Sequence, residues 1–149
     1  MIKLYIDLEC TIIDNWDSFE IIHCAVPLIE KYPNIPIEIF SFAVDNDKDM
    51  AKLETNMCNL NVSFNREFSN NFKVELLSGW YNLPMYSIKN MGKEKGFVDY
   101  LTFYVIGDEL TNTTFVLIDD MVSHMKSIDL GNGNSVLFLN HFVHQLYEE

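Results

Sequence analysis

Short, nearly continuous apolar runs of strand length recur along this chain and divide it into alternating segments. They occur in residues 2–7 ("IKLYID"), 37–44 ("IEIFSFAV"), 111–121 ("TNTTFVLIDDM", in which the apolar run 115–118 is followed by two acids) and 135–140 ("SVLFLN"). Strands that are apolar on both faces are typical of parallel sheets, because helices cover such sheets on either side. The pattern therefore predicts an α/β fold with a central, mainly parallel sheet.

The segments between these runs have the apolar spacing or the acidic first turn of a helix. They are residues 17–32, 45–60, 95–105 and 122–130. Pro33 and Pro36 follow the first of them, and proline cannot continue a helix. The sequence "GNGN" at 131–134 is expected to form a turn after the last helix. Strands that alternate with helices predict helices on both faces of the sheet, that is, a three-layer α/β/α Rossmann-like domain.

The length of 149 residues fits one domain, and no repeat, low-complexity tract or Pro/Gly/Ser-rich linker divides the chain. Residues 60–92 fit the pattern least. Within them "VSFNREF" alternates like a short strand, and aromatic residues then mix with Gly79 and Pro84. We expect this segment to form a short strand with a small lid, or an irregular connection.

Composition limits the partners. The chain carries 22 acidic and 10 basic residues, a formal net charge of -12, which repels nucleic-acid polymers and anionic membranes and attracts divalent cations. Its apolar runs are far shorter than the roughly 20 residues of a membrane helix. Lys3 and Asp7 interrupt the only signal-like segment at the N-terminus. We expect a soluble cytoplasmic protein without a membrane or an extended nucleic acid as partner.

The cysteines do not suggest a disulfide framework. Cys10, Cys24 and Cys58 are odd in number and widely spaced, which argues against structural disulfides and against a CxxC metal site. Cys10 has no electropositive neighbour in the sequence that would lower its pKa. We interpret it as an ordinary thiol rather than a nucleophile.

Acidic side chains come at the ends of two predicted strands, Asp7 with Glu9 and Asp119 with Asp120, and Ser41 comes near the end of a third. Ligands of open α/β sheets bind beyond the carboxyl ends of the strands, so we expect these side chains to converge. Carboxylates that lie close together repel one another unless a cation neutralises them, and oxygen ligands suit Mg²⁺. The alternative for either pair alone is a solvated strand end.

These residues resemble the motifs of the haloacid dehalogenase-like (HAD) superfamily over essentially the whole chain. The first motif of that superfamily, hhhhDxDxT, is matched by "LYIDLECT", which supplies Asp7, Glu9 and Thr11. The second motif, a serine or threonine near the end of the next strand, is matched by Ser41 in "IEIFSF".

The two remaining motifs lie in the second half of the chain. The fourth, an apolar strand that ends in acids, is matched by Asp119 and Asp120 in "FVLIDD". The third is a lysine at the start of the preceding helix. Lys95 has the better spacing for this lysine, and Lys93 is a close rival.

The resemblance implies a phosphatase that acts through an aspartyl-phosphate. Asp7 would attack phosphorus. Mg²⁺ would be held by Asp7, by Asp120 or Asp119, and by the backbone carbonyl of Glu9. The implied substrate is a phosphomonoester: a small metabolite, a nucleotide or an exposed phosphate end of something larger.

The resemblance also assigns the supporting residues. Ser41 and Lys95 would hold the phosphoryl oxygens, and Thr11 would steady the turn after the first strand. Glu9 stands where phosphatases of this superfamily have the aspartate that protonates the leaving group, so its carboxyl is one methylene further from the backbone.

Spacing limits the insertions that relatives carry. About 34 residues separate Asp7 from Ser41, which excludes a large helical cap there, and about 54 separate Ser41 from Lys95, which allows at most a very small lid. Trp16 lies where relatives have a small flap, and packing beside the first helix is an equal interpretation. We interpret His124 as a histidine on a helix face.

Two other functions remain open. The chain could be a catalytically weak or inactive HAD-like domain that serves as a binding or regulatory protein, with Glu9 as the sign of lost acid-base function. It could also be a doubly wound domain of another family, such as a response-regulator-like receiver. Receivers place their phosphorylated aspartate on a middle strand, whereas "IEIFSFAV" carries Ser41.

Overall fold

The computed structural model describes residues 1–32, 35, 37–41, 46–49, 51–56, 74–75, 92–107 and 109–142. Most of the segment 60–92, including the predicted strand "VSFNREF" and the possible lid, lies outside these ranges. Among the helices within them, none has the length and apolar character needed to cross a membrane.

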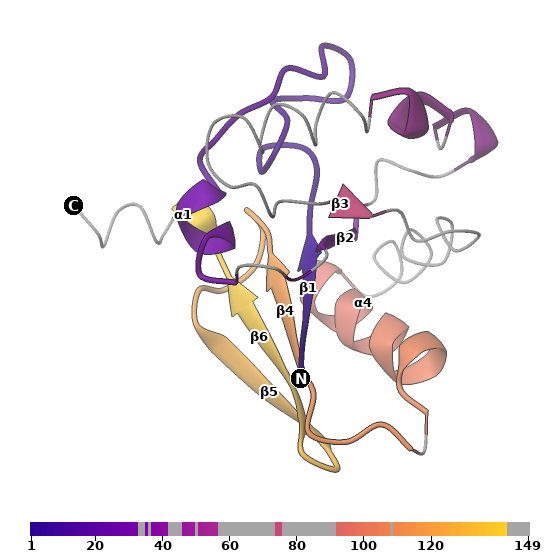
Figure 1. The fold of residues 1–149 in the computed structure, drawn as a ribbon, viewed down its shortest axis with the longest axis vertical. Coiled ribbons are helices and arrows are strands. Elements are labelled where there is room, and N and C mark those ends of the chain that lie inside the picture. Colours follow the sequence, from indigo (N-terminus) through magenta and orange to yellow (C-terminus); the bar gives the residue numbers. More distant parts are fainter. Residues whose placement is uncertain are drawn as a thin grey trace.

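The described residues form a six-stranded sheet with the strand order β3-β2-β1-β4-β6-β5 (Figure 1). The first five strands in this order run parallel, and β5 pairs antiparallel with β6 at one edge. The strands are β1 (Ile2–Ile6), β2 (Ile37–Ile39), β3 (Val74–Glu75), β4 (Thr114–Ile118), β5 (Lys126–Gly131) and β6 (Asn134–Leu139). The predicted α/β fold with a mainly parallel sheet is confirmed.

The named helices of the described residues are α1 (Val26–Ile29) and α4 (Lys93–Tyr100), and α4 continues as the π-helical η1 (Leu101–Val105). Pro27 lies in the first turn of α1, where its missing N–H costs no hydrogen bond. Residues 47–49 and 51–56 are also helical, which confirms most of the helix predicted at 45–60. The helix predicted at 95–105 is present and begins two residues earlier.

The helix predicted at 17–32 is wrong, because only Val26–Ile29 is helical. The carboxylate of Asp14 accepts hydrogen bonds from the Ser18 hydroxyl and from the Glu20 N–H (3.0 Å). Phe19 has a positive φ of 53°, which no helix allows. Polar side chains that bind nearby backbone groups offer the chain an alternative to helix, and here that alternative prevails.

The helix predicted at 122–130 is also wrong, because this segment contains β5, half of an antiparallel hairpin with β6. Asn132 and Gly133 both have positive φ, 54° and 76°, which a tight two-residue hairpin turn requires. Ile128 and Leu130 pack against the core while Asp129 between them is exposed. This period of two belongs to a strand. The turn predicted at 131–134 is present, but it joins two strands.

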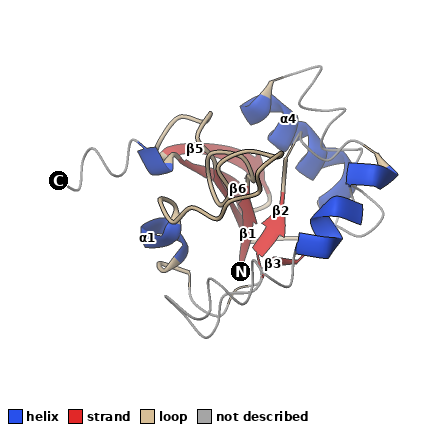
Figure 2. Ribbon diagram, turned by 90° about the horizontal axis from the view of Figure 1, so that it is seen from above, coloured by secondary structure: helices blue, strands red, loops and turns tan. Residues whose placement is uncertain are grey.

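Apolar side chains fill both faces of the sheet. Leu4 and Ile6 of β1 belong to one buried cluster together with α1, and Tyr5 between them belongs to a second cluster with α4 and η1. Figure 2 shows α1 and α4 on opposite sides of the strands. The ring of Phe97 on α4 lies edge-on to Tyr5, with centroids 5.1 Å apart. This packing fixes the start of α4 against the centre of the sheet.

Candidate functional site

Two of the predicted site residues follow neighbouring strands. Ile6 of β1 pairs with Ile118 of β4, so the next residues, Asp7 and Asp119, lie side by side at the carboxyl end of the sheet. The Asp7 N–H extends the ladder by donating to the Ile118 carbonyl at 3.1 Å. Both acids are buried. They are therefore not solvated strand ends.

Asp120 completes a group of three carboxylates. Each of Asp7, Asp119 and Asp120 offers one oxygen, and these oxygens lie within 4.8 Å of one another. Asp7 and Asp119 are buried and Asp120 is half-buried. Oxygen ligands of this kind suit hard divalent cations such as Mg²⁺, which takes one or two carboxylates and keeps its other positions for water and substrate.

The lysine that reaches these acids is Lys93, the first residue of α4. Its Nζ lies 3.3 Å from Asp7 Oδ1 and 2.9 Å from Asp119 Oδ2. It also donates to the Phe40 carbonyl at 3.3 Å. Lys93 is thus buried among oxygens from three strand ends.

Lys95 had the better spacing in the sequence, but the structure places it elsewhere, with an exposed side chain. Because each helical residue turns the chain by about 100°, position 95 lies about 200° around α4 from position 93. The helix begins at Lys93. The two lysines therefore cannot both face the acids, and Lys93 takes the position expected of Lys95.

Ser41 is buried near the same edge, two residues beyond β2. The N–H of the preceding residue, Phe40, donates to the Ile6 carbonyl at 2.9 Å, so the chain after β2 stays beside the end of β1. The carbonyl of Phe40 accepts from Lys93 Nζ. Asp7, Lys93, Asp119, Asp120 and the chain entering Ser41 are therefore brought together.

Glu9 uses its carboxylate differently. Its Oε2 accepts a hydrogen bond from the Trp16 N–H at 3.1 Å, and its side chain is half-buried. Between these residues the chain turns sharply, with Cys10 at a φ of 61°. Among the described residues, the group of converging carboxylates consists of Asp7, Asp119 and Asp120 and does not include the carboxylate of Glu9. Lys52 donates to the Trp16 carbonyl and holds this loop in turn.

Burial dominates the electrostatics of the acid group. It raises the pKa of Asp7 to about 7, with Lys93 opposing the shift and Asp119 adding to it. Burial likewise raises the pKa of Asp119. Burial disfavours the charge of Lys93, but Asp7 and Asp119 outweigh it and raise the pKa of the ammonium. Burial thus opposes the ionisation of both acids, and the charge of Lys93 offsets only part of this effect.

The residues after β6 hold both acid-bearing loops, and the sequence reasoning missed them. Thr11 Oγ1 and His141 Nε2 are hydrogen-bonded at 3.2 Å, and both side chains are fully buried. Asn140 Nδ2 donates to the carbonyls of Asp120 (3.2 Å) and Val122 (2.8 Å). The available signal was the polar pair Asn140 and His141 directly after an apolar strand.

Two residues considered from the sequence have ordinary roles here. His124 lies in the turn before β5 rather than on a helix face, and its Nδ1 accepts from the Asn140 N–H at 3.1 Å. Partial burial and the carboxylates of Asp120 and Glu9 raise the pKa of the Cys10 thiol. A raised pKa leaves less thiolate, so Cys10 remains interpreted as an ordinary thiol.

Comparisons with models of protein families, with curated proteins and with solved structures found no match. A function for this chain must therefore be inferred from its motifs and from the geometry of this site.

Proposed function

We propose that this protein is an Mg²⁺-dependent phosphatase of the HAD-like type, built on a three-layer α/β/α Rossmann-like domain. The observation that supports it best is the convergence of Asp7, Asp119 and Asp120 within 4.8 Å, with Lys93 in ion pairs to two of them. The substrate would be a phosphomonoester: a small metabolite, a nucleotide or an exposed phosphate end. The exposed, unpaired Cys10 suits a reducing compartment, so we place the protein in the cytoplasm.

The three carboxylates fit a magnesium ion by their chemistry and spacing. They supply only oxygen, and Asp119 and Asp120 add to the rise that burial causes in the pKa of Asp7, a repulsion that a divalent cation would relieve. When bound, such an ion would offset the repulsion between the Asp7 carboxylate and the anionic phosphoryl group.

Four side chains of the protein would each have a separate role in the reaction. An Asp7 oxygen forms a bond to phosphorus, and the bond from phosphorus to the ester oxygen breaks as Glu9 gives that oxygen a proton. Glu9 then takes a proton from the water that attacks the aspartyl-phosphate, which releases inorganic phosphate and restores Asp7. Ser41 and Lys93 hold the phosphoryl oxygens throughout.

Hydrolysis of a panel of phosphomonoesters in the presence of MgCl₂ tests this function through the inorganic phosphate released. We expect release from some of the panel, and a loss of at least about a thousandfold in Asp7→Asn, because an amide is no nucleophile. Asp17→Asn is the matched control, since Asp17 is exposed on the loop that follows. Absence of release from every ester, or full release by Asp7→Asn, would refute the proposal.

A second candidate is a catalytically weak or inactive HAD-like domain that binds or regulates a partner. The observation that favours it is the hydrogen bond from the Trp16 N–H to Glu9 Oε2, which engages one oxygen of the expected acid-base group. Glu9→Asp separates the two candidates. A large gain in phosphate release would indicate a site no longer tuned for catalysis, and no gain or a loss would indicate a site tuned to glutamate.

A further inference from the structure

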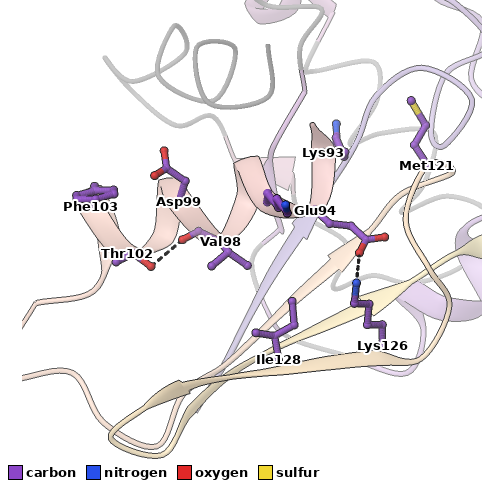
Figure 3. A pocket seen from close by; sticks show the side chains of 10 residues that line it. Lys93, Glu94, Val98, Asp99, Thr102, Phe103, Met121, Lys126 and Ile128 are labelled. Atoms are coloured by element: carbon purple, nitrogen blue, oxygen red, sulfur yellow. Dashed lines mark hydrogen bonds and ion pairs between the residues drawn. The ribbon is translucent and has the colours of Figure 1, made fainter. Parts of the chain in front are cut away.

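A cavity of about 770 Å³ lies beside α4 on the side that faces β5 (Figure 3). Its wall is formed by α4 and η1, by Met121 in the loop after β4, and by Lys126 and Ile128 of β5. This volume is within the range of about 300–1,000 Å³ that small-molecule sites occupy. The cavity is thus large enough for a ligand of the size of a metabolite.

The cavity adjoins the acid site. Lys93 lines it, and the Nζ of Lys93 is 2.9 Å from Asp119 Oδ2. Met121 also lines it, and the Met121 N–H donates to Asp119 Oδ1 at 2.7 Å. A molecule with its phosphate at Asp7 would therefore have this cavity next to it.

The lining away from the acid site includes three apolar side chains, Val98, Phe103 and Ile128, beside Asp99 and Thr102. The side chains of Val98 and Ile128 point toward one another across the gap between α4 and β5 (Figure 3). Met121 and Phe103 also line the cavity although they are 62% and 72% exposed. Methionine is flexible and adapts to the shape of an apolar ligand. These exposed apolar side chains favour a ligand with an apolar body.

The charged side chains on the wall are three lysines and two acids, Glu94 and Asp99. Three of the ten basic residues of this acidic chain line the cavity. Lys93 is engaged by Asp7 and Asp119, and Lys126 pairs with Glu94 at 2.7 Å (Figure 3). Lys95 is exposed and has no hydrogen bond or ion pair to another described residue. It lies on α4, two residues after Lys93.

We propose that this cavity binds the organic part of the substrate, which is then a single, dissolved phosphomonoester with an extended apolar chain. The chain lies along Val98, Ile128 and Phe103, and the charge of Lys95, which does not reach the acid site, attracts the anionic end from a distance. From Lys93 to Phe103 the helix rises about 15 Å, which sets the length of chain that the cavity holds. The chemistry at phosphorus rests on the proposed function, but binding in the cavity does not.

Unbranched alkyl phosphates of increasing length, each below its micelle concentration, test the cavity through kcat/KM. We expect kcat/KM to rise by about threefold per methylene until the cavity is filled, because each buried methylene adds apolar contact. Phe103→Ala should reduce this gain for the longest chains only. Tyr104→Ala is the matched control, since Tyr104 is the exposed aromatic neighbour that does not line the cavity.

Lys95→Met should act differently, lowering kcat/KM by about the same factor for every chain length, because Lys95 attracts the anion common to all of them. Lys48→Met, at another exposed lysine, is its control and should change nothing. A kcat/KM that is independent of chain length, or equal effects of Phe103→Ala and Tyr104→Ala, would overturn the cavity proposal.

Calorimetric titration with octane-1-sulfonate separates binding from turnover. We expect binding that Phe103→Ala weakens by about tenfold or more and that Tyr104→Ala leaves unchanged. Such binding without any hydrolysis would support the cavity and refute the phosphatase. Hydrolysis without sulfonate binding would support the phosphatase and overturn the cavity proposal. Cosedimentation with vesicles that contain phosphatidic acid, without binding of the monomeric sulfonate, would place the apolar chain in a bilayer and overturn the proposal.

Discussion

The loops that follow β1 and β4 each have two acidic residues within their first three positions, but these acids make different contacts. After β4, Asp119 and Asp120 both join the group of converging carboxylates. After β1 only Asp7 does so, while Glu9 binds the Trp16 N–H. Of two similar sequence patterns, one thus brings both of its acids into the group of converging carboxylates and the other brings only one.

The turns explain this difference. Asp119 Oδ1 accepts the Met121 N–H at 2.7 Å, which tightens the chain at once and keeps Asp120 beside Asp119. After Asp7 the chain turns later, around Cys10, whose φ is positive. Glu9 lies just before that turn and faces the following loop. The position of an acid within a turn therefore decides whether it joins the site, more than its distance from the strand in sequence.

The largest effect on stability is expected for Lys93→Met, which removes the cation shared by the two loops. Asp7 and Asp119 would then be buried without an ion-pair partner. We expect the free energy of unfolding to fall by about 3–5 kcal/mol near neutral pH without metal. Denaturant unfolding measures this change.

Lys95→Met is the control for that substitution, because Lys95 is exposed on the same helix. We expect its free energy of unfolding to change by less than about 0.5 kcal/mol. The loss in Lys93→Met should also be smaller at acid pH, where Asp7 is protonated. Equal losses in the two variants would contradict the central position of Lys93.

The second effect is on the way in which the stability of the metal-free protein depends on pH. The pKa of Asp7 is raised from 3.8 to about 7, mainly by burial, so between these values the folded state holds a proton that the unfolded state has lost. Stability should therefore fall as pH rises from about 4 to about 7. Asp7→Asn should flatten this fall.

Magnesium should oppose this fall, because it binds the ionised carboxylates and favours the folded state above pH 7. Unfolding midpoints at several pH values, measured in EDTA and in MgCl₂, test both effects. If the midpoint in EDTA rises with pH across this window, the buried acids do not control stability.

The sequence predicted the centre of the fold better than its edges. β1, β4 and β6 are mostly apolar, and burial on both faces leaves such segments few alternatives. The hairpin strand β5 was predicted as a helix because its residues alternate only weakly in polarity. The helix predicted at 17–32 failed because hydrogen bonds to Asp14 fold its first half into a loop. Apolar periodicity does not report such local side-chain bonds.

The site, like the fold, was predictable in part. The meeting of Asp7 and Asp119 was predictable, because the carboxyl ends of neighbouring parallel strands coincide. The choice of Lys93 over Lys95 depends on the residue at which α4 begins, and such boundaries are uncertain by one or two residues. The bond between Thr11 and His141 joins positions 130 residues apart. A single sequence without other members of a family carries no signal for that contact.

The third effect concerns the hydrogen bonds by which the residues after β6 hold the loops that follow β1 and β4. Thr11→Val removes the hydrogen bond to His141 and leaves a buried nitrogen without it, whereas Asn140→Ala removes two bonds to the carbonyls of Asp120 and Val122. We expect each variant to lower the free energy of unfolding by about 1–3 kcal/mol. Titration with Mg²⁺ should also show weaker binding in Asn140→Ala, because Asp120 is then less well held. Unchanged binding would show that this loop needs no such support.

Among the residues of the two loops, the smallest effect on stability is expected for Glu9→Gln, at the one acid that lies outside the group of converging carboxylates. The amide keeps an oxygen that can accept the Trp16 N–H, so the free energy of unfolding should fall by less than about 1 kcal/mol. Phosphate release should nevertheless fall by about a hundredfold or more, since an amide cannot transfer the proton. Denaturant unfolding and phosphate assays on the same preparation separate these results. A loss of several kcal/mol with unchanged release would mean that Glu9 serves the loop after β1 and takes no part in hydrolysis.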